Sequence, residues 1–302
     1  MKKKILCAGE ILWDSMPPGL FLGGAPYNAG YHLNKLGLDV YIISRVGDDD
    51  LGREAVKRAE ASGVYTDLIQ VDPDLSTGFV EVNLGADGIP EYNIKKPVAW
   101  DEISLNPELA GVAESADALI FGTLAQRSET SRNTIRQLGK TDRLKVLDLN
   151  FRFPYVDPDI TDQSLQMADV VKMNHEELEQ LQKWFSLSGE MKEAIRQVSD
   201  RFSLEMVCVT SGAVGALLWD GSRFYEGKSY KVNVADTVGS GDAFLAVLVS
   251  GYLKGVPPEK LIRYSNRMGA FIATQNGGTP DYRLGSIEEI DSLPLSVSPP
   301  SS

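Results

Sequence analysis

Short apolar runs alternate with amphipathic ones along most of the chain. Six runs of six to eight residues are apolar almost throughout, a pattern typical of strands buried on both faces of a sheet. These predicted strands are "KKILCAG" (3–9), "VYIISRVG" (40–47), "DALIFG" (117–122), "LKVLDLN" (144–150), "DVVKMN" (169–174) and "EMVCVT" (205–210).

Helical patterns with clear end signals lie between these runs. One runs from Pro26 to Leu36, with proline near its start and Gly37 just past its end, which is a typical arrangement of start and stop residues. Further helices are predicted over 51–62, 129–138, 176–185 and 190–200. Alternating strands and helices predict an α/β fold with a mostly parallel sheet covered by helices on both faces.

One stretch, residues 76–100, breaks this rhythm. It alternates with period two from Phe79 to Leu84, has a turn signal at 85–88, and continues into a second extended run. This pattern predicts a hairpin that stands apart from the parallel sheet. No repeat or linker divides the chain, so residues 1–302 are predicted to form one domain, with residues 295–302 as a disordered tail.

The amino-acid composition limits the classes of molecule that this chain is expected to bind. The chain has 42 acidic residues against 30 Lys and Arg, a formal net charge of -12, which excludes nucleic-acid binding through basic patches. A phosphorylated small molecule remains compatible, because backbone dipoles can hold a phosphate. The apolar N-terminal run soon meets Glu10 and Asp14, so neither a signal peptide nor a membrane span is expected.

The two cysteines also bear on location. Cys7 and Cys208 both fall in strand-like apolar runs, which predicts two buried, reduced thiols and a cytoplasmic protein.

Several common catalytic motifs are absent from the sequence. There is no G-x-x-x-x-G-K-[ST] and no G-x-S-x-G, and Phe244 occupies the place of the third glycine in a dinucleotide fingerprint. His32 and His175 are the only histidines, and no Cys/His group has the spacing of a zinc site. The sequence therefore gives little support to a P-loop enzyme, a dehydrogenase, a histidine-based hydrolase or a zinc protein.

The stretch "VGSGD" (238–242) opens an apolar, helix-like run. Glycines let the backbone approach a ligand closely, and the first amides of a helix form an anion site. Asp242 in this position has two interpretations. It caps the helix, as aspartate often does, or it takes a proton from a hydroxyl that attacks a phosphoryl group held by the amides.

The order of further motifs bears on this choice. They are "GEILWD" (9–14), "LGGAPYNAGYHLNKLG" (22–37), "ISRVGDDDLG" (43–52), "DLNFR" (148–152), "KMNHEE" (172–177), "VTSGAVGALL" (209–218) and "DTVGSGD" (236–242). In this order and spacing, over about residues 5–281, the chain resembles the ribokinase-like, pfkB-type carbohydrate kinases, and most closely their fructokinase branch. The resemblance implies a ribokinase-like three-layer fold, with a small β-sheet lid formed by segments near 11–21 and 76–100.

The resemblance also implies roles for particular residues. Asp242 corresponds to the catalytic base, and the amides of Gly239, Ser240 and Gly241 to the anion hole. Residues implied in sugar binding are Asp14, Gly24, Asn28, Phe79, Tyr92 and Arg152. Residues implied in binding ATP and magnesium are Asn174, Glu177, Thr210, Gly212 and Asn266. A potassium site is implied at Asp236 and Val238.

Structural alternatives exist for several of these residues. Asp14 also fits a solvated turn, Asn28 a polar position in a first helical turn, and Asn266 a solvated helix position. Asn174 and Glu177 also fit a capping box, and Arg152 a surface ion pair. For Phe79 and Tyr92, ordinary hairpin packing is an equal alternative.

The function predicted from the resemblance is ATP- and Mg²⁺-dependent phosphorylation of a sugar, with fructose giving fructose 6-phosphate as the leading reaction. Alternatives in the same family are 2-keto-3-deoxygluconate kinase, ribokinase and nucleoside kinase. A non-enzymatic alternative is a sugar or nucleotide sensor that has lost catalysis. A homodimer joined through the lids is also predicted, since exposed apolar patches tend to pair.

Overall fold

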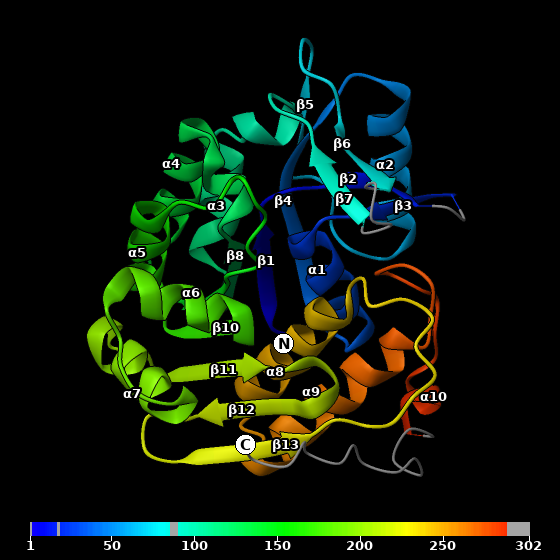
Figure 1. Ribbon diagram of the computed structural model, residues 1–302. Coiled ribbons are helices and arrows are strands. Elements are labelled where there is room, and N and C mark those ends of the chain that lie inside the picture. Colours follow the sequence, from blue (N-terminus) through cyan, green and yellow to red (C-terminus); the bar gives the residue numbers. More distant parts are fainter. Residues whose placement is uncertain (1, 17–18, 85–89, 289–302) are drawn as a thin grey trace. The chain divides into compact units, whose positions relative to one another are not determined.

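The computed structural model describes residues 2–16, 19–84 and 90–288; side chains at 16, 82–84, 90–92 and 288 also lie outside the described part (Figure 1). The chain divides into two units, Met1–Arg143 and Leu144–Ser302, which are treated in turn. Within the described residues, no helix has both the length and the apolar character needed to cross a membrane. The predicted tail at 295–302 lies outside the described residues.

The first unit contains four parallel strands in the order β8-β1-β4-β5 (Figure 1). Ile5, Leu6 and Cys7 of β1 are fully buried, as expected for a strand covered on both faces. Three of these strands were predicted from their continuous apolar runs, and the short β5 was not. Their bounds are β1 (Lys4–Ala8), β4 (Asp39–Gly47), β5 (Ile69–Asp72) and β8 (Ala118–Gly122).

Helices of the first unit begin where the sequence supplies start signals. Helix α1 has Pro26 in its first turn and packs against β1 and β4. Helix α2 is capped by the side chain of Asp49, which accepts a hydrogen bond from the Gly52 amide at 2.7 Å. The bounds are α1 (Ala25–Lys35), α2 (Asp50–Ala61), α3 (Pro107–Glu114) and α4 (Glu129–Leu138), with short helices η1 (Ala99–Glu102) and η2 (Leu124–Arg127).

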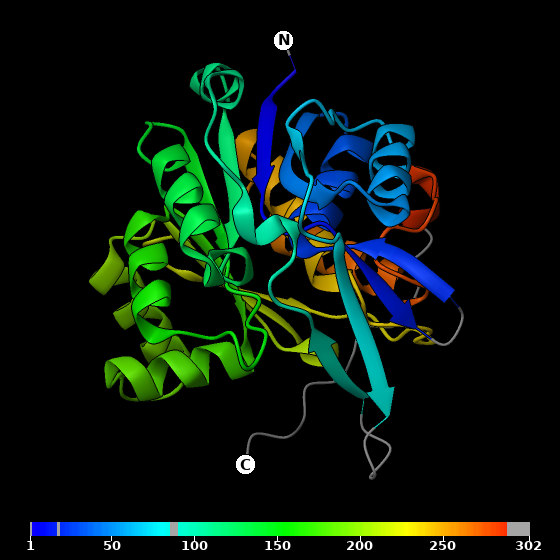
Figure 2. The same cartoon turned by 90° about the horizontal axis from the view of Figure 1, so that it is seen from above.

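A separate four-stranded sheet also belongs to the first unit, in the order β3-β2-β6-β7 (Figure 2). The predicted hairpin is confirmed as the antiparallel pair β6 and β7, and its predicted turn at 85–88 lies outside the described residues. A second antiparallel pair, β2 and β3, completes the sheet through a parallel β2–β6 contact. The bounds are β2 (Leu12–Met16), β3 (Gly19–Gly23), β6 (Gly78–Leu84) and β7 (Pro90–Ile94).

The second unit contains five strands in the order β13-β12-β11-β10-β9 (Figure 1). Strands β9 (Leu144–Asp148), β10 (Val170–Asn174) and β11 (Met206–Thr210) are parallel and were predicted. Strands β12 (Gly215–Trp219) and β13 (Phe224–Lys228) are antiparallel and were not. Because parallel strands end at one edge of a sheet, Asp148, Asn174 and Thr210 come to the same edge.

Helices of the second unit include the apolar α8 predicted to follow the glycine-rich stretch. Helix α8 packs along α9, which in turn packs against β12 and β13. The bounds are α5 (Pro158–Met167), α6 (His175–Phe185), α7 (Met191–Phe202), α8 (Ser240–Leu253), α9 (Pro258–Ala273) and α10 (Leu284–Glu288), with the short helix η3 (Gly212–Val214). The predicted α/β class with a mostly parallel sheet and a separate small sheet is thus confirmed.

Candidate active site

The turn before α8 has a backbone shape that depends on glycine. Gly239 lies at φ 75°, and a Cβ there would overlap the Cα of Gly278 and lie 2.8 Å from its carbonyl oxygen. Only glycine reaches this conformation and this approach without strain. The Ser240 amide donates to the Thr237 carbonyl at 3.2 Å, so the turn itself uses one of the three amides predicted for the anion hole.

Asp236 connects this turn to the loop after α9. One carboxylate oxygen accepts from the Val238 amide at 3.0 Å, and the other accepts from the Gly277 amide at 3.2 Å. The Ala235 amide also donates to the carbonyl of Ala273 at 2.9 Å. Asp236 and Val238, the residues predicted at a cation site, therefore lie where two backbone segments meet.

Asp242 occupies the first turn of α8 and is 9% exposed. The cap residue of this described helix is Gly239, and the helix has no side-chain cap hydrogen bond. The geometry therefore does not support the interpretation of Asp242 as a simple cap. A carboxylate held in the first turn of a helix, beside a glycine turn that can receive an anion, suits a general base in phosphoryl transfer.

Lys172 brings a buried positive charge close to Asp242. Its Nζ lies 2.9 Å and 3.2 Å from the two carboxylate oxygens of Asp148, and both residues are nearly fully buried. Burial acts to lower the pKa of Lys172, but the charges of Asp148, Glu177 and Asp242 outweigh it and raise the pKa above its usual value. The ammonium therefore stays charged within a group of three carboxylates.

Asn174 and Glu177 form the capping box that was their structural alternative. The Glu177 amide donates to Asn174 Oδ1 at 2.8 Å, and the Asn174 amide donates to Glu177 Oε2 at 2.7 Å. Glu177 Oε1 also accepts from the Phe151 amide at 2.8 Å. Burial raises the pKa of Glu177 above its usual value. A carboxylate has further lone pairs, so the role in ATP and metal binding stays a prediction.

The other residues predicted at the nucleotide side lie on neighbouring elements of the second unit. Thr210 ends β11, and its hydroxyl lies 3.4 Å from the Met173 carbonyl. Gly212 begins η3 at φ 51°, with open space where a Cβ would lie. Asn266 is buried on α9, with its Nδ2 against Gly227 of β13. Asn266 is therefore not the solvated helix position that was its alternative.

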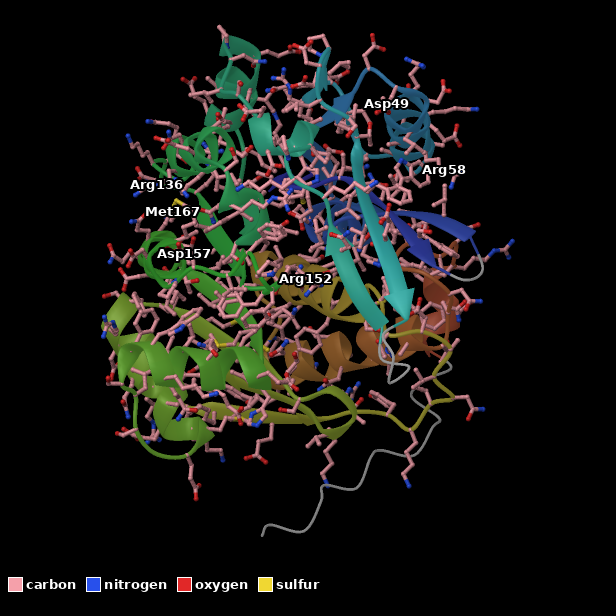
Figure 3. The ribbon with its side chains drawn as sticks, turned by 45° about the horizontal axis from the view of Figure 1, so that its top comes forward. Asp49, Arg58, Arg136, Arg152, Asp157 and Met167 are labelled. Atoms are coloured by element: carbon pink, nitrogen blue, oxygen red, sulfur yellow. The ribbon has the colours of Figure 1, made fainter. Side chains whose placement is uncertain are left out.

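Arg152 lies in the segment between β9 and α5 (Figure 3). Its side chain is exposed, and its Nη1 donates to the carbonyl of the neighbouring Phe151 at 3.0 Å. This contact neither supports nor excludes the predicted role in sugar binding, which stays a prediction.

Asp14 and Asn28, the residues predicted to bind sugar hydroxyls, come together in the first unit. A Cβ on Gly23 would lie 2.5 Å from Asp14 Oδ2 and 3.9 Å from Asn28 Oδ1. Gly24 lies at φ 107°, and a Cβ there would overlap the Glu10 carbonyl oxygen. Carboxylate and amide groups gathered over glycine backbone match the donors and acceptors of a polyol. Asp14 lies in strand β2, not in the solvated turn that was its alternative.

Strand register separates Phe79 from Asp14. Phe79 pairs with Trp13, whereas Asp14 pairs with Val80, and neighbouring residues on a strand face opposite sides of the sheet. The predicted contact of Phe79 with a sugar held by Asp14 is therefore not supported. The side chain of Tyr92, predicted for the same role, lies outside the described part of the structure.

Three charged residues near these groups were missed by sequence reasoning. Asp148 and Lys172 pair across two strands, and Glu10 is 3% exposed with its Oε1 at 3.3 Å from the Ala25 amide. The usable signal was a charged residue inside an otherwise apolar strand, Asp148 in "LKVLD" and Lys172 in "VVKMN", because a charge is rarely buried without a partner.

Comparison with known proteins fits this geometry. Residues 10–283 match the family model of the pfkB family carbohydrate kinases. An uncharacterized sugar kinase of Pyrococcus horikoshii is 30% identical over 269 residues, covering 85% of this chain and 81% of that protein. Its structure aligns at a TM-score of 0.81 with 26% identity, covering 95% of this chain and 97% of that chain.

Two fructokinases are also similar. That of Klebsiella pneumoniae is 28% identical over 301 residues, covering 92% of this chain and 95% of that protein. The ATP-bound structure of Xylella fastidiosa fructokinase aligns at a TM-score of 0.83 with 23% identity, covering 96% and 98% of the two chains. A family match over nearly the whole chain, together with these relatives, shows that this chain belongs to the pfkB family of carbohydrate kinases and is a sugar kinase.

Proposed function

We propose that this sugar kinase transfers the γ-phosphoryl group of ATP to the terminal hydroxyl of fructose, giving fructose 6-phosphate. The observation that carries the proposal is Asp242 in the first turn of α8, directly after the glycine turn at Gly239. Asp242 takes the proton from the attacking hydroxyl, while backbone amides of the turn stabilise charge on the phosphoryl group. Catalysis of this kind consists mainly of positioning and electrostatics.

Asp14, Gly24 and Asn28 are proposed to bind the sugar. Asp14 and Asn28 offer oxygen acceptors and an amide donor to adjacent hydroxyls, and Gly24 lets the backbone approach closely. The small sheet that carries Asp14 is proposed to act as the lid, within a single kinase domain. Closure of a lid excludes water from a phosphoryl-transfer site.

Fructose is proposed as the first substrate because fructokinases are similar to this chain over nearly its whole length. A relative that phosphorylates a sugar acid, 2-dehydro-3-deoxygalactonokinase of Haloferax volcanii, is 26% identical over 273 residues, so a 2-keto-3-deoxy sugar acid is the second candidate.

ATP and a divalent metal ion, Mg²⁺, are the proposed cofactors. A fructokinase of Vibrio cholerae with this fold was solved with fructose, ADP and a calcium ion. Among the described residues, no three His, Cys, Asp or Glu side chains are grouped to hold a metal ion. This fits Mg²⁺, which is commonly held by one or two carboxylates plus substrate phosphates. Asn174 and Glu177 are the proposed protein contributors, and the ion would neutralise phosphate charge.

A monovalent cation, K⁺, is proposed at Asp236 and Val238. Asp236 holds two backbone segments together, and carbonyl oxygens at such a junction suit potassium. A bound cation would order the turn and raise kcat. Equal kcat in potassium and in a bulky organic cation would contradict this proposal.

A homodimer joined through the small sheets is proposed as the assembly. Light scattering at micromolar concentration measures it directly, and a monomeric mass would contradict it.

The proposed reaction is tested by measuring ATP consumption with a panel of sugars. Fructose, 2-keto-3-deoxygluconate, ribose and a nucleoside are compared by kcat/KM, and the product from fructose is identified by NMR. We expect the highest kcat/KM with fructose and a phosphate on its terminal hydroxyl. A higher value with another sugar would overturn the choice of fructose, and binding without turnover would indicate a sensor.

A further inference from the structure

Lys172 has more negative partners than a structural ion pair needs. Asp148 already contacts its ammonium through both carboxylate oxygens, at 2.9 Å and 3.2 Å. Glu177 and Asp242 act on the same ammonium electrostatically. One positive charge therefore contacts one carboxylate and is influenced by two more in a buried site, where charges are screened far less than in water.

The ammonium of Lys172 also packs against the turn that opens α8. A Cβ placed on Gly241 would lie 3.0 Å from Lys172 Nζ and 3.7 Å from its Cε. Gly241 immediately precedes Asp242, so the ammonium lies directly against the helical turn from which Asp242 projects. Lys172 reaches this turn from β10, whose end carries Asn174.

We propose that Lys172 is a positioning residue for phosphoryl transfer. Its ammonium holds the first turn of α8 in place and supplies the positive charge that lets the terminal phosphate of a nucleotide approach three carboxylates. The proposal rests on the function proposed above and extends it to a residue that contacts Asp148 and the turn at Gly241.

The electrostatic argument concerns the nucleotide. A terminal phosphate is strongly negative, and carboxylates that neither a metal ion nor an ammonium neutralises would repel it. The amides at the start of α8 attract an anion, but their partial charges face the carboxylates of Asp148, Glu177 and Asp242. An ammonium among these carboxylates offsets part of the repulsion. Its effect should therefore grow with the number of phosphates on the nucleotide.

The chain offers a matched control for this pair. Lys145, the second residue of β9, pairs with Asp169 at 3.0 Å, and Asp148 is the last residue of the same strand. Three residues of extended strand separate Lys145 from Asp148, roughly 10 Å. Loss of Lys145 removes the same kind of ion pair from the same sheet without touching the α8 turn.

The experiment compares Lys172→Met, Asp148→Asn, the double variant of both, and Lys145→Met. The double variant leaves no unpaired carboxylate at residue 148, and the net charge of the cluster equals that of the wild type. If Lys172 serves only to neutralise Asp148, the double variant should recover wild-type kcat. If it acts on the phosphoryl group and the turn, kcat should stay down by about 10²-fold, the effect of losing one electrostatic stabiliser. Asp148→Asn and Lys145→Met should each retain at least about a tenth of kcat.

A binding measurement separates this role from a general loss of structure. Calorimetric titration with AMP, ADP and a non-hydrolysable ATP analogue is made on each folded variant. We expect the double variant to bind AMP like the wild type and to lose at least about tenfold in affinity for the ATP analogue. Should the double variant not fold, Lys172→Gln combined with Asp148→Asn, which keeps polar side chains without charge at both positions, enters the same comparison.

Two results would overturn the proposal. One is a double variant with kcat like that of Lys145→Met, and the other is an equal loss of affinity for AMP and for the ATP analogue. Failure of the proposed function gives a different result, because a wild-type protein without turnover on any sugar would still show the phosphate-dependent binding difference.

Discussion

The two units bury charged side chains in different ways. In the first unit, Arg127 donates to both carboxylate oxygens of Asp101 at 2.7 Å and 2.9 Å, with both side chains 2% exposed. Asp101 also accepts from the Val98 amide at 3.0 Å, and the guanidinium lies 3.9 Å from the centre of the Trp100 ring. In the second unit, Lys172 faces Asp148, Glu177 and Asp242 together.

This difference indicates which buried charges serve the scaffold and which serve the reaction. A one-to-one pair of opposite charges is balanced without a ligand. A cluster with surplus negative charge costs stability, and such costs concentrate at functional sites. Within the cluster of the second unit, burial raises the pKa of Glu177 above its usual value.

The largest expected effect on stability follows from breaking the balanced pair. Arg127→Met leaves Asp101 buried without its cation, and this should lower the free energy of unfolding by about 3–5 kcal/mol. Chemical denaturation measures the loss. Arg53→Met, which removes an exposed pair with Asp48, should leave the free energy of unfolding almost unchanged. If Arg127→Met keeps the stability of the wild type but its kcat falls by about 10²-fold, the Arg127–Asp101 pair serves the reaction and the distinction between the two units is wrong.

An intermediate effect is expected at the turn before α8. Gly239→Ala forces alanine into a left-handed conformation and against the backbone of Gly278. Gly255→Ala shares the first cost, about 1–2 kcal/mol, but meets open space. We expect Gly239→Ala to be less stable than Gly255→Ala and to lose kcat, while Gly255→Ala keeps it. Equal stability and equal kcat in the two variants would show that the turn has no special geometry.

The smallest effect is expected at Asp49, which supports the base of β6. Its carboxylate accepts from the Thr77 amide and hydroxyl at 2.8 Å and 2.7 Å. Asp49→Asn places an amide donor against the buried Thr77 amide, which then lacks its acceptor. We therefore expect the free energy of unfolding to fall by about 1–2 kcal/mol at neutral pH. Turnover per folded molecule should change little.

The pH dependence of the stability of Asp49→Asn tests the direction of the pKa shift of Asp49. The pKa of Asp49 is lowered in the folded protein, so its stabilisation is complete above its unfolded value near 3.9 and is lost as pH falls through the lower folded value. Urea midpoints of wild type and Asp49→Asn should differ equally at pH 7 and pH 5, and converge below about pH 4. A difference that widens on acidification would contradict this assignment.

Much of the fold could be predicted from the sequence, because buried parallel strands read as continuous apolar runs. Strands β12 and β13 were missed: β12 follows β11 after a short turn, and β13, "FYEGK", has no apolar run of its own. Helix α5, "PDITDQSLQM", was missed because its few apolar residues form a weak helical pattern.

Residues of the candidate site could be proposed from the sequence only where they lie together in one contiguous motif. Asp242 and Gly239 fall in one stretch, and Asp14 and Asn28 in two neighbouring ones. Lys172 and Asp148 are 24 residues apart, and only strand pairing shows that they meet. The face on which Phe79 lies could not be predicted for a similar reason: register, which decides the face of a strand, is set by tertiary pairing.

Turnover by the Asp242→Asn variant tests most directly whether the first turn of α8 carries the reaction. Asparagine keeps the size of the side chain but cannot take a proton, so kcat should fall by at least about 10²-fold with KM for sugar and ATP roughly kept. The melting temperature should stay close to that of the wild type, because no described cap hydrogen bond of α8 depends on this side chain. A folded variant that retains more than about a tenth of wild-type kcat would contradict the role of Asp242 as the general base.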